Sequence, residues 1–353
     1  MKGDKPRVAR NVSISSLVKF VFSLLLAAAL FHLATARLEG TLVQRLVAAE
    51  PDWLLIGFLL YGLGIALACW RWGRLLEVLE VQVPMLLLLR LGLIGIAFSF
   101  ALPGAVSGDV VKAGYVAAYA ADRQVEAALS VIVDRLLGLL GLFLVTLLVL
   151  TSTPLDAFVA SPILQAGIGL VLLMAAFGTG TLLAIFLHRS LMWMRLGRAV
   201  ARRIPERVRL PLRRIAAASD LFRAHPRVLV VALAASMGVH SLVGLSVFAL
   251  SRAVGVTSLA LRPCFVATQV ANTLAAIPLT PGGVGGRDLV LSRFLEATSL
   301  PPSAASLIPA LLTLVLLAWS AIGGLVFFLQ AVPTATPSER SASEVAEPAL
   351  TDV

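Results

Sequence analysis

The sequence predicts an all-α fold, a polytopic bundle of membrane-spanning helices, and three observations lead to this prediction. Of the 353 residues, 59% are hydrophobic and only 14% are charged, whereas soluble domains are about 45–50% apolar and about 25% charged. Several apolar runs approach the roughly 20 residues that one helix needs to cross a bilayer. Basic residues are concentrated at a few places between these runs, as is typical of cytoplasmic loops.

About eight apolar runs, separated by charges or prolines, each predict a spanning helix. The first also fits a signal peptide, because basic residues precede it and small residues end it; its length and the many runs that follow favour a span. We expect the eight helices at Leu17–Ala36, Trp53–Trp70, Met85–Leu102, Leu129–Leu150, Ile163–Leu187, Val228–Leu250, Pro263–Leu279 and Ala304–Gln330.

The distribution of charge predicts a multi-pass protein of the inner (cytoplasmic) membrane with a cytoplasmic N-terminus. Residues 1–16 are basic, and the Arg-rich loop 188–227 has few acidic residues, so both are expected to be cytoplasmic. The loop also fits an amphipathic helix attracted to anionic lipids. Residues 17–331 form one transmembrane domain, and residues 332–353 are expected to be a disordered tail. Because the basic residues flank spans and lack interleaved aromatics, nucleic acid is not an expected partner.

This orientation gives a contradiction near residue 103 that only a broken element resolves. The third run ends outside and the fourth must begin inside, yet no ordinary span lies between Leu102 and Leu129. The intervening stretch contains Pro103, Gly104 and Gly108, followed by Asp109. It is too short and too polar for a normal helix, so we expect a broken or re-entrant element there.

A second Pro-Gly stretch has the same place relative to a later apolar run. It reads Pro281-Gly282-Gly283-Val284-Gly285-Gly286 and continues with Arg287-Asp288, where the first reads Pro-Gly-Ala-Val-Ser-Gly-Asp. The similarity suggests an internal repeat and a molecule of two halves. Paired Gly- and Pro-interrupted segments in corresponding positions are typical of transporter binding sites.

The Pro-Gly stretches suggest an anion site. Proline ends the preceding helix and glycine permits a positive φ, and the helix that follows presents free N–H groups to a phosphate or carboxylate. Non-helical backbone at membrane depth is tolerated where protein buries it or a wet cavity adjoins it. The alternative is close helix packing, because Gly104 to Gly108 and Gly282 to Gly286 both fit GxxxG.

Charged and polar side chains near these stretches are the candidate ligands. Asp109 and Lys112 are three residues apart and share a helix face, so they can pair. Asp134 and Arg135 are neighbours, so they are expected to have separate partners. Asn272 and Gln269 precede the second stretch by about one turn and are candidates for the same cavity. Arg71 and Arg74 are interpreted as anchors at the membrane interface.

The sequence contains no Walker A, HExxH or GxSxG motif and no cofactor fingerprint. No cofactor is therefore expected, and no metal site is expected from the two separated cysteines, Cys69 and Cys264. The sequence does not decide whether the chain is an enzyme, but it favours a protein without catalytic activity.

Four pieces of the sequence resemble one family. They are Arg71-Trp72-Gly73-Arg74-Leu75-Leu76, Leu102-Pro103-Gly104 with Gly108-Asp109, Asp134-Arg135-Leu136-Leu137-Gly138-Leu139, and Ile277 to Gly285. Together they resemble the transmembrane region of lysylphosphatidylglycerol synthases and related flippase-like proteins, from about Leu17 to Leu329.

The resemblance implies lipid translocation between leaflets. The sequence departs from the family pattern in both loops. The first loop has Ser107-Gly108-Asp109 and Lys112 where the family often has Gly-Gly-Asp and an arginine, and Asp288 stands where the family favours glutamate, with charge retained in each case. The soluble aminoacyl-transfer domain of the full synthases is not present after the membrane region, so lipid aminoacylation by this chain alone is not expected.

The leading hypothesis is a flippase or transporter for an anionic phospholipid or lipid-linked headgroup. The headgroup phosphate would lie between the two Pro-Gly stretches, neutralised by Arg287 and Lys112, while Asp109 and Asp288 hold those cations or gate the site. Asp134 and Arg135 would couple the two halves or contact the headgroup. One alternative is a membrane transferase for a polyprenyl-phosphate or phospholipid, with Asp109 or Asp134 as base. Another is a non-transporting partner of a lipid-modifying enzyme.

Overall fold

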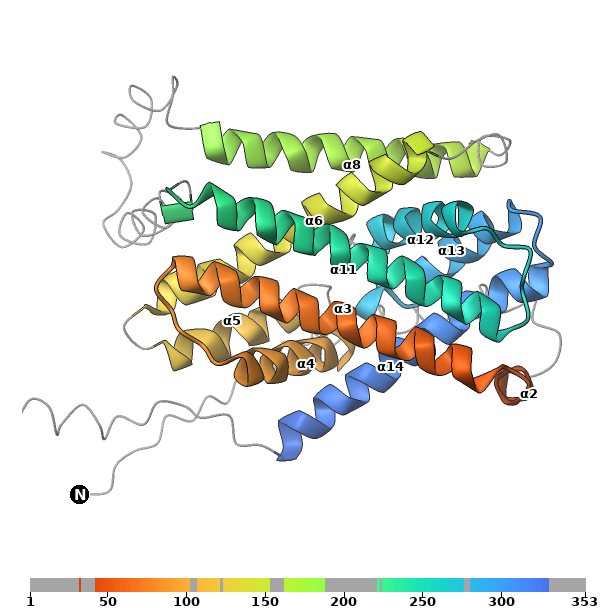
Figure 1. The fold of residues 1–353 in the computed structure, drawn as a ribbon, viewed down its shortest axis with the longest axis horizontal. Helices are drawn as coiled ribbons and strands as arrows, with labels where there is room; N and C mark the ends of the chain where they lie inside the picture. The colour runs from red at the N-terminus through yellow and green to blue at the C-terminus, as the bar shows by residue number, and fades with distance from the viewer. Residues whose placement is uncertain are drawn as a thin grey trace, which may run out of the picture.

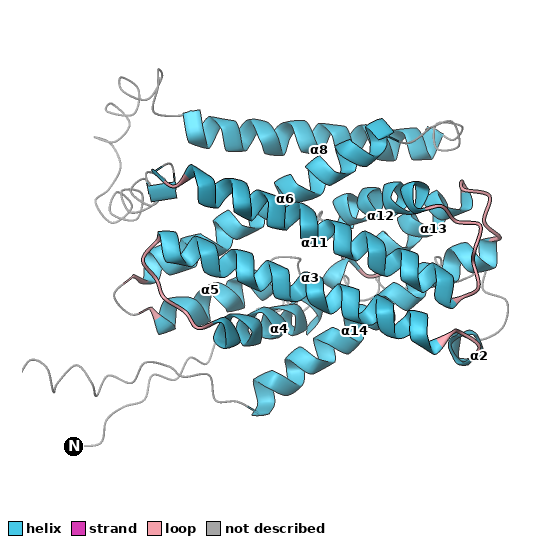
Figure 2. Ribbon diagram, viewed as in Figure 1, coloured by secondary structure: helices cyan, strands magenta, loops and turns pink. Residues whose placement is uncertain are grey.

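The computed structural model describes residues 32, 42–101, 107–120, 123–152, 162–187, 221–222, 224–275 and 280–329. All regular elements among these residues are helices, which confirms the all-α prediction (Figure 2). The first apolar run, most of the Arg-rich loop and the tail lie outside the described residues. The elements are α2 (Leu42–Val47), α3 (Pro51–Val78), α4 (Met85–Ala101), α5 (Ser107–Tyr119), α6 (Gln124–Ser152), α8 (Pro162–Leu187), α11 (Pro226–Ala253), α12 (Leu261–Ala275), the 3-10 turn η1 (Pro281–Gly283), α13 (Gly286–Glu296) and α14 (Pro302–Leu329).

Four of the described helices, α3, α6, α11 and α14, are long and apolar enough to cross a membrane. Each has 28 or 29 residues, which at 1.5 Å per residue gives about 42 Å, more than the roughly 30 Å of hydrocarbon. The sequence predicted about eight spans, and the four long helices do not reach that number. The chain is an integral membrane protein, and the described helices do not confirm the predicted number of about eight spans.

Two of the expected spans are halves of helical hairpins instead. The runs Met85–Leu102 and Pro263–Leu279 correspond to α4 and α12, of 17 and 15 residues, about 26 and 22 Å long. Each packs against the still shorter helix that follows it, α4 against α5 and α12 against α13. At 13 and 11 residues, α5 and α13 are too short to cross the bilayer on their own. The broken elements expected from the sequence are therefore present as two hairpins.

Glycine makes the second break possible. After α12, the chain turns at η1, where Gly282, Gly283 and Gly285 have φ of 59°, 73° and 79°, a region that other L-residues rarely adopt. Pro281 stands at the start of the turn. The corresponding residues of the first break, 102–106, include Pro103 and Gly104 and lie outside the described residues.

The described helices fall into two halves of the same design. The order long, short, short, long occurs as α3, α4, α5, α6 and again as α11, α12, α13, α14, with α8 between them. Figure 1 shows that α3 and α11 run in opposite directions, and that the α4–α5 hairpin lies at one end of the bundle while α12–α13 lies at the other. The second half is therefore inverted relative to the first, an arrangement found in secondary transporters.

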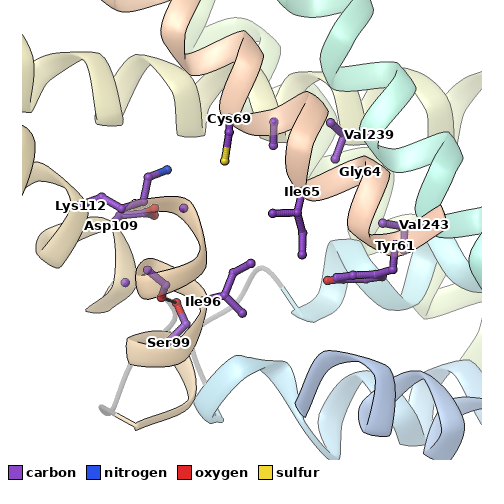
Figure 3. Close-up of a pocket in the computed structure, with 14 residues that line it drawn as sticks. Tyr61, Gly64, Ile65, Cys69, Ile96, Ser99, Asp109, Lys112, Val239 and Val243 are labelled. Atoms are coloured by element: carbon purple, nitrogen blue, oxygen red, sulfur yellow. Dashed lines mark hydrogen bonds between the residues drawn. The ribbon is translucent and has the colours of Figure 1, made fainter. Parts of the chain in front are cut away.

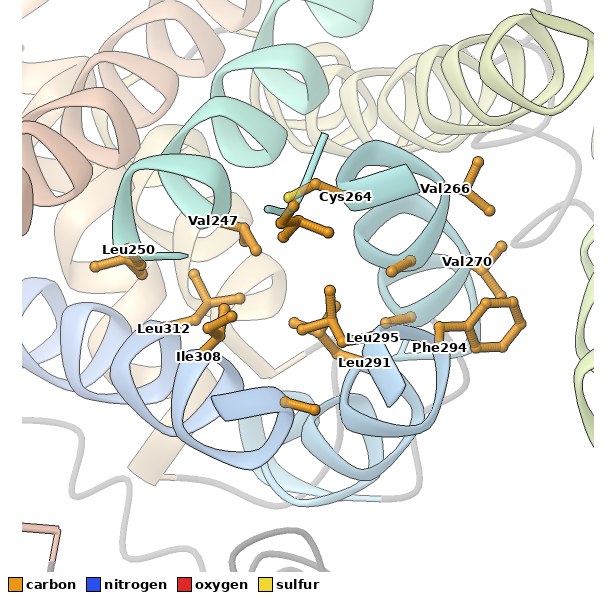
Figure 4. Packing of buried hydrophobic residues seen from close by; sticks show 14 of the residues in the cluster. Val247, Leu250, Cys264, Val266, Val270, Leu291, Phe294, Leu295, Ile308 and Leu312 are labelled. Atoms are coloured by element: carbon orange, nitrogen blue, oxygen red, sulfur yellow. The ribbon is translucent and has the colours of Figure 1, made fainter. Parts of the chain in front are cut away.

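The two halves meet along α3 and α11. Gly57 and Gly64 of α3 lie against Leu250 and Leu242 of α11, and the Ser246 hydroxyl donates to the Gly57 carbonyl at 2.7 Å. The largest apolar cluster surrounds α12, α13 and the first part of α14, with Leu291, Leu295 and Ile308 at its centre (Figure 4). A membrane protein gains little from apolar contact alone, so small residues and interhelical hydrogen bonds carry more of the packing.

Close backbone contact fixes the first hairpin. A Cβ on Gly108 of α5 would lie 2.1 Å from the Gly95 carbonyl oxygen of α4. On the other face of α4, a Cβ on Gly323 of α14 would lie 2.0 Å from the Leu93 carbonyl oxygen. For Gly108, the packing interpretation of the glycine pattern therefore holds.

Candidate functional site

A cavity of about 230 Å³ lies between α3, α4, α5 and α11. Glycines of α3 and α4 leave the space, while Tyr61, Ser99, Asp109 and Lys112 give it polar walls. Figure 3 shows Asp109 and Lys112 on one side of the cavity and Tyr61 across from them. Two of the candidate residues from the sequence, Asp109 and Lys112, therefore line one cavity.

Asp109 and Lys112 do not form the pair that their spacing allows; each has a partner on α6 instead. Asp109, in the first turn of α5, accepts a hydrogen bond from Arg135 of α6 at 2.7 Å. The Lys112 Nζ lies 4.0 Å from the Asp134 carboxylate and 4.4 Å from the centre of the Trp72 ring. Both charged residues of α5 therefore have a partner on α6: Arg135 for Asp109, and Asp134 for Lys112.

Behind Lys112 lies a buried ion pair. The Arg71 Nε donates to Asp134 at 2.8 Å, and its Nη1 donates to the Ser236 hydroxyl at 2.7 Å. The Arg71 and Asp134 side chains are 6% and 9% exposed. Asp134 and Arg135 therefore have separate partners, as predicted, and Asp134 joins α3, α5 and α6.

Together these five side chains carry an excess of positive charge. The first charge cluster, as we call it, contains three bases, Arg71, Lys112 and Arg135, and two acids, Asp109 and Asp134. An excess charge in a membrane is costly unless a counter-ion is present. Lys112, with its side chain 14% exposed, is the base of this cluster that lines the cavity. The cluster is thus suited to a ligand with one negative charge.

The second charge cluster is closed. The Arg287 Nη2 donates to Asp288 at 2.7 Å and to the Thr313 hydroxyl at 2.5 Å, and that hydroxyl donates to Asp288 at 2.8 Å. Asp288 also accepts from the Gly285 backbone N–H at 2.9 Å, which caps α13. With Arg287 5% exposed and Asp288 fully buried, this cluster ties α13 to α14.

The second Pro-Gly turn contacts the first hairpin. Gly282 of η1 lies against the Phe100 ring at the end of α4, where an added Cβ would be 2.7 Å away. The second Pro-Gly turn therefore lies against the end of α4, the helix that leads into the first Pro-Gly stretch.

Other candidate residues lie apart from the cavity. Gln269 is fully buried and its Nε2 donates to the His240 carbonyl at 2.9 Å, while its Oε1 has no hydrogen-bond partner among the described residues. Asn272, half-buried, is not among the cavity-lining residues. Pro281, Gly283 and Gly286 shape the turn and the start of α13 without lining the cavity.

Sequence reasoning missed Arg71 as a site residue. It was interpreted as an interface anchor because hydropathy ends the apolar run at Trp70, but α3 continues to Val78 and carries Arg71 into the interior. The neighbouring Trp72 is fully buried and donates to the Ser130 hydroxyl at 2.9 Å. A signal was present, because both residues belong to one of the four family-like pieces.

Two inverted halves, each with a broken hairpin, and a charged cavity between helices define a class of integral membrane proteins built around an internal site. A family model described as the lysylphosphatidylglycerol synthase TM region matches residues 17–324, so the chain belongs to that family. The match covers α3 to α13 and most of α14. A search of curated proteins gives no match to this chain.

Proposed function

We propose that this protein moves a lipid with an anionic headgroup between the leaflets of the membrane. The observation that carries the proposal is the cavity beside the first charge cluster, where three bases face two acids within a membrane bundle. A phosphodiester supplies the one negative charge that balances this excess. The acyl chains remain in the surrounding lipid while the headgroup passes through the protein.

Each of the charged residues has a distinct role in this proposal. Lys112 contacts the phosphate, because it lines the cavity and its nearest carboxylate is 4.0 Å away. Asp109 holds Arg135 at the edge of the cavity. Arg71 and Asp134 join the halves and fix Lys112, while Arg287 and Asp288 hold the second hairpin rather than the headgroup.

The inverted halves support transport as the activity. With hairpins at opposite ends of the bundle, movement of one half against the other opens the cavity to each side in turn. We place the α4–α5 end on the cytoplasmic side of an inner membrane, because Arg74 and Arg123 lie near that end and basic residues favour the cytoplasm.

A transferase acting on a lipid phosphate is the alternative from a different class. It needs a carboxylate that is free to accept a proton, and the two candidates are Asp109 and Asp134. Asp109 already accepts from Arg135, and Asp134 from Arg71. The geometry therefore favours charge-holding roles for both, and transport over transfer.

The test is lipid translocation by the purified protein in liposomes. Fluorescent lipids of several headgroups are reconstituted with it, and an impermeant reductant reports which molecules reach the outer leaflet. We expect protein-dependent flipping of anionic lipids, reduced at least tenfold in Lys112→Met, which keeps the length and apolar stem of the side chain and removes the charge. One lost charge-assisted hydrogen bond of about 1.5–3 kcal/mol corresponds to a factor of about 10 or more.

The matched control is Arg123→Gln, which removes a base that pairs with Glu80 at the surface and does not line the cavity. It is expected to flip lipid at the wild-type rate. Equal flipping by Lys112→Met and wild type would refute the site. If no headgroup is flipped by folded wild-type protein while product forms from a lipid-phosphate donor, the transferase replaces the flippase.

A further inference from the structure

A second hollow opens on the surface of the bundle between α3, α4 and α14. It has a volume of about 380 Å³, and its walls are mainly apolar. Leu86, Leu89 and Leu93 form one side, while Trp319 and Val326 of α14 form the other. Walls of this kind suit an acyl chain.

One charged side chain, Arg90, lines this groove. It is half-buried, and within the described part of the chain it has no ion pair or hydrogen bond. In contrast, Arg74 and Arg123 each pair with a surface glutamate. An intramembrane base without a protein partner is costly and indicates a functional site.

The position of Arg90 suits a lipid phosphate. It is the sixth residue of α4, about 8 Å along the helix from its start, a depth at which a long basic side chain reaches toward the headgroup layer. A guanidinium binds a phosphate through two parallel hydrogen bonds. The groove thus offers one cation for the phosphate and apolar walls for the chain below it.

The groove adjoins the central cavity. Ile65 of α3 lines both spaces, and it is the residue that the two have in common. Figure 3 shows Ile65 on the cavity side, across from Lys112. The groove that holds Arg90 and the cavity that Lys112 lines therefore adjoin at Ile65.

We propose that this groove is a lateral portal, in which Arg90 holds the phosphate of an anionic bilayer phospholipid before its headgroup passes Ile65 into the cavity. The passage rests on the proposed function, whereas the binding of lipid at Arg90 does not. The portal selects lipid by charge, and the cavity then receives only what the portal has admitted.

The groove contains its own reporter, Trp319. Its indole stacks on Phe58 with ring centres 4.6 Å apart, and its Nε1 donates to the Phe58 carbonyl at 3.2 Å. Bromine atoms on an acyl chain quench tryptophan fluorescence at contact. Subtracting the signal of Trp319→Phe protein from that of the wild type isolates the contribution of Trp319.

The experiment compares brominated phosphatidylglycerol with brominated phosphatidylcholine, each at the same fraction in otherwise unlabelled vesicles. We expect a preference of about fivefold for the anionic lipid at Trp319, the ratio expected for one base near a membrane surface. Arg90→Gln is expected to remove the preference, and Arg90→Lys to retain part of it. Arg74→Gln, the control, keeps it in full.

Equal quenching by the two lipids in the wild type, or a preference unchanged in Arg90→Gln, would overturn the portal. Flipping is measured in parallel on the same samples. A preference at Trp319 without any flipping refutes the proposed function and leaves the binding site standing. Ile65→Phe is expected to keep the preference while slowing the flipping, which separates binding from passage; unchanged flipping in that variant would place the route elsewhere.

Discussion

The two broken hairpins occupy equivalent places in the two halves, yet their charges are arranged differently. In the first hairpin, Asp109 and Lys112 line a cavity and pair with side chains of another helix, α6. In the second, Arg287 and Asp288 pair with each other and with Thr313, and both are buried. The cluster around the first hairpin is open and carries an excess positive charge, and the cluster of the second hairpin is closed and balanced.

This difference indicates a division of work between related elements. A closed, fully hydrogen-bonded cluster in a low-dielectric interior holds its helix in place. In the proposed function, the open cluster with its excess positive charge binds the headgroup. The same Pro-Gly break would then serve stability in one half and binding in the other, and substitutions are expected to separate the two effects.

The largest effect on stability is expected for Asp288→Ala. It leaves Arg287 buried without a counter-ion and removes the cap on Gly285. Breaking a buried pair in this way costs about 3–5 kcal/mol. Thermal unfolding in detergent, followed by circular dichroism or by loss of a monodisperse chromatographic peak, should show a strongly lowered midpoint.

The double replacement of Arg287 and Asp288 by Met and Leu is the matched control. It removes both charges together, so it is expected to cost less than Asp288→Ala alone. A single replacement as stable as the wild type would show that the second hairpin does not depend on this cluster, and the contrast between the hairpins would fail.

A smaller effect is expected for Gly108→Ala in the first hairpin. The added methyl would lie 2.1 Å from the Gly95 carbonyl oxygen, a backbone atom that cannot rotate away. Helix α5 must therefore shift from α4, at a cost of about 1–3 kcal/mol. Differential scanning fluorimetry of the solubilised protein measures the change.

Helix α5 supplies the control for that substitution, because a Cβ on Gly114 would meet nothing within 4 Å. Gly114→Ala is expected to be neutral or stabilising by up to about 1 kcal/mol, since alanine favours a helix more than glycine. If both alanines lower the midpoint equally, helix contact is not the reason for Gly108.

Much of the architecture could be predicted from the sequence. A proline followed closely by several glycines identifies a break, whereas a lone proline need not, since Pro309 lies inside α14. Both broken elements were therefore expected between the correct helices. Hydropathy alone cannot distinguish half a hairpin from a full span, since α4 is as apolar as a crossing helix and only its length, 17 residues, differs. The predicted number of about eight spans is therefore not confirmed by the described helices, four of which are long enough to cross.

The candidate site could be predicted only in part, because its ion pairs join distant residues. Helix geometry showed that Asp134 and Arg135 face different ways, without identifying their partners. Arg71 and Asp134 are 63 positions apart, and Asp109 and Arg135 are 26 apart. The spacing in the sequence allowed a pair between Asp109 and Lys112. In the folded structure, each of them pairs with a residue of α6 instead.

The smallest effect on stability is expected for Asp109→Ala, although its effect on transport is large. The Asp109 and Arg135 side chains are 24% and 33% exposed, and a pair that retains this much contact with its surroundings is worth about 1 kcal/mol or less. The unfolding midpoint should therefore stay near that of the wild type. Lipid flipping should fall, because Arg135 loses its carboxylate partner and the arrangement of charges beside the cavity changes. A variant that unfolds as readily as Asp288→Ala would make Asp109 a structural residue, and the two hairpins would then differ in exposure but not in role.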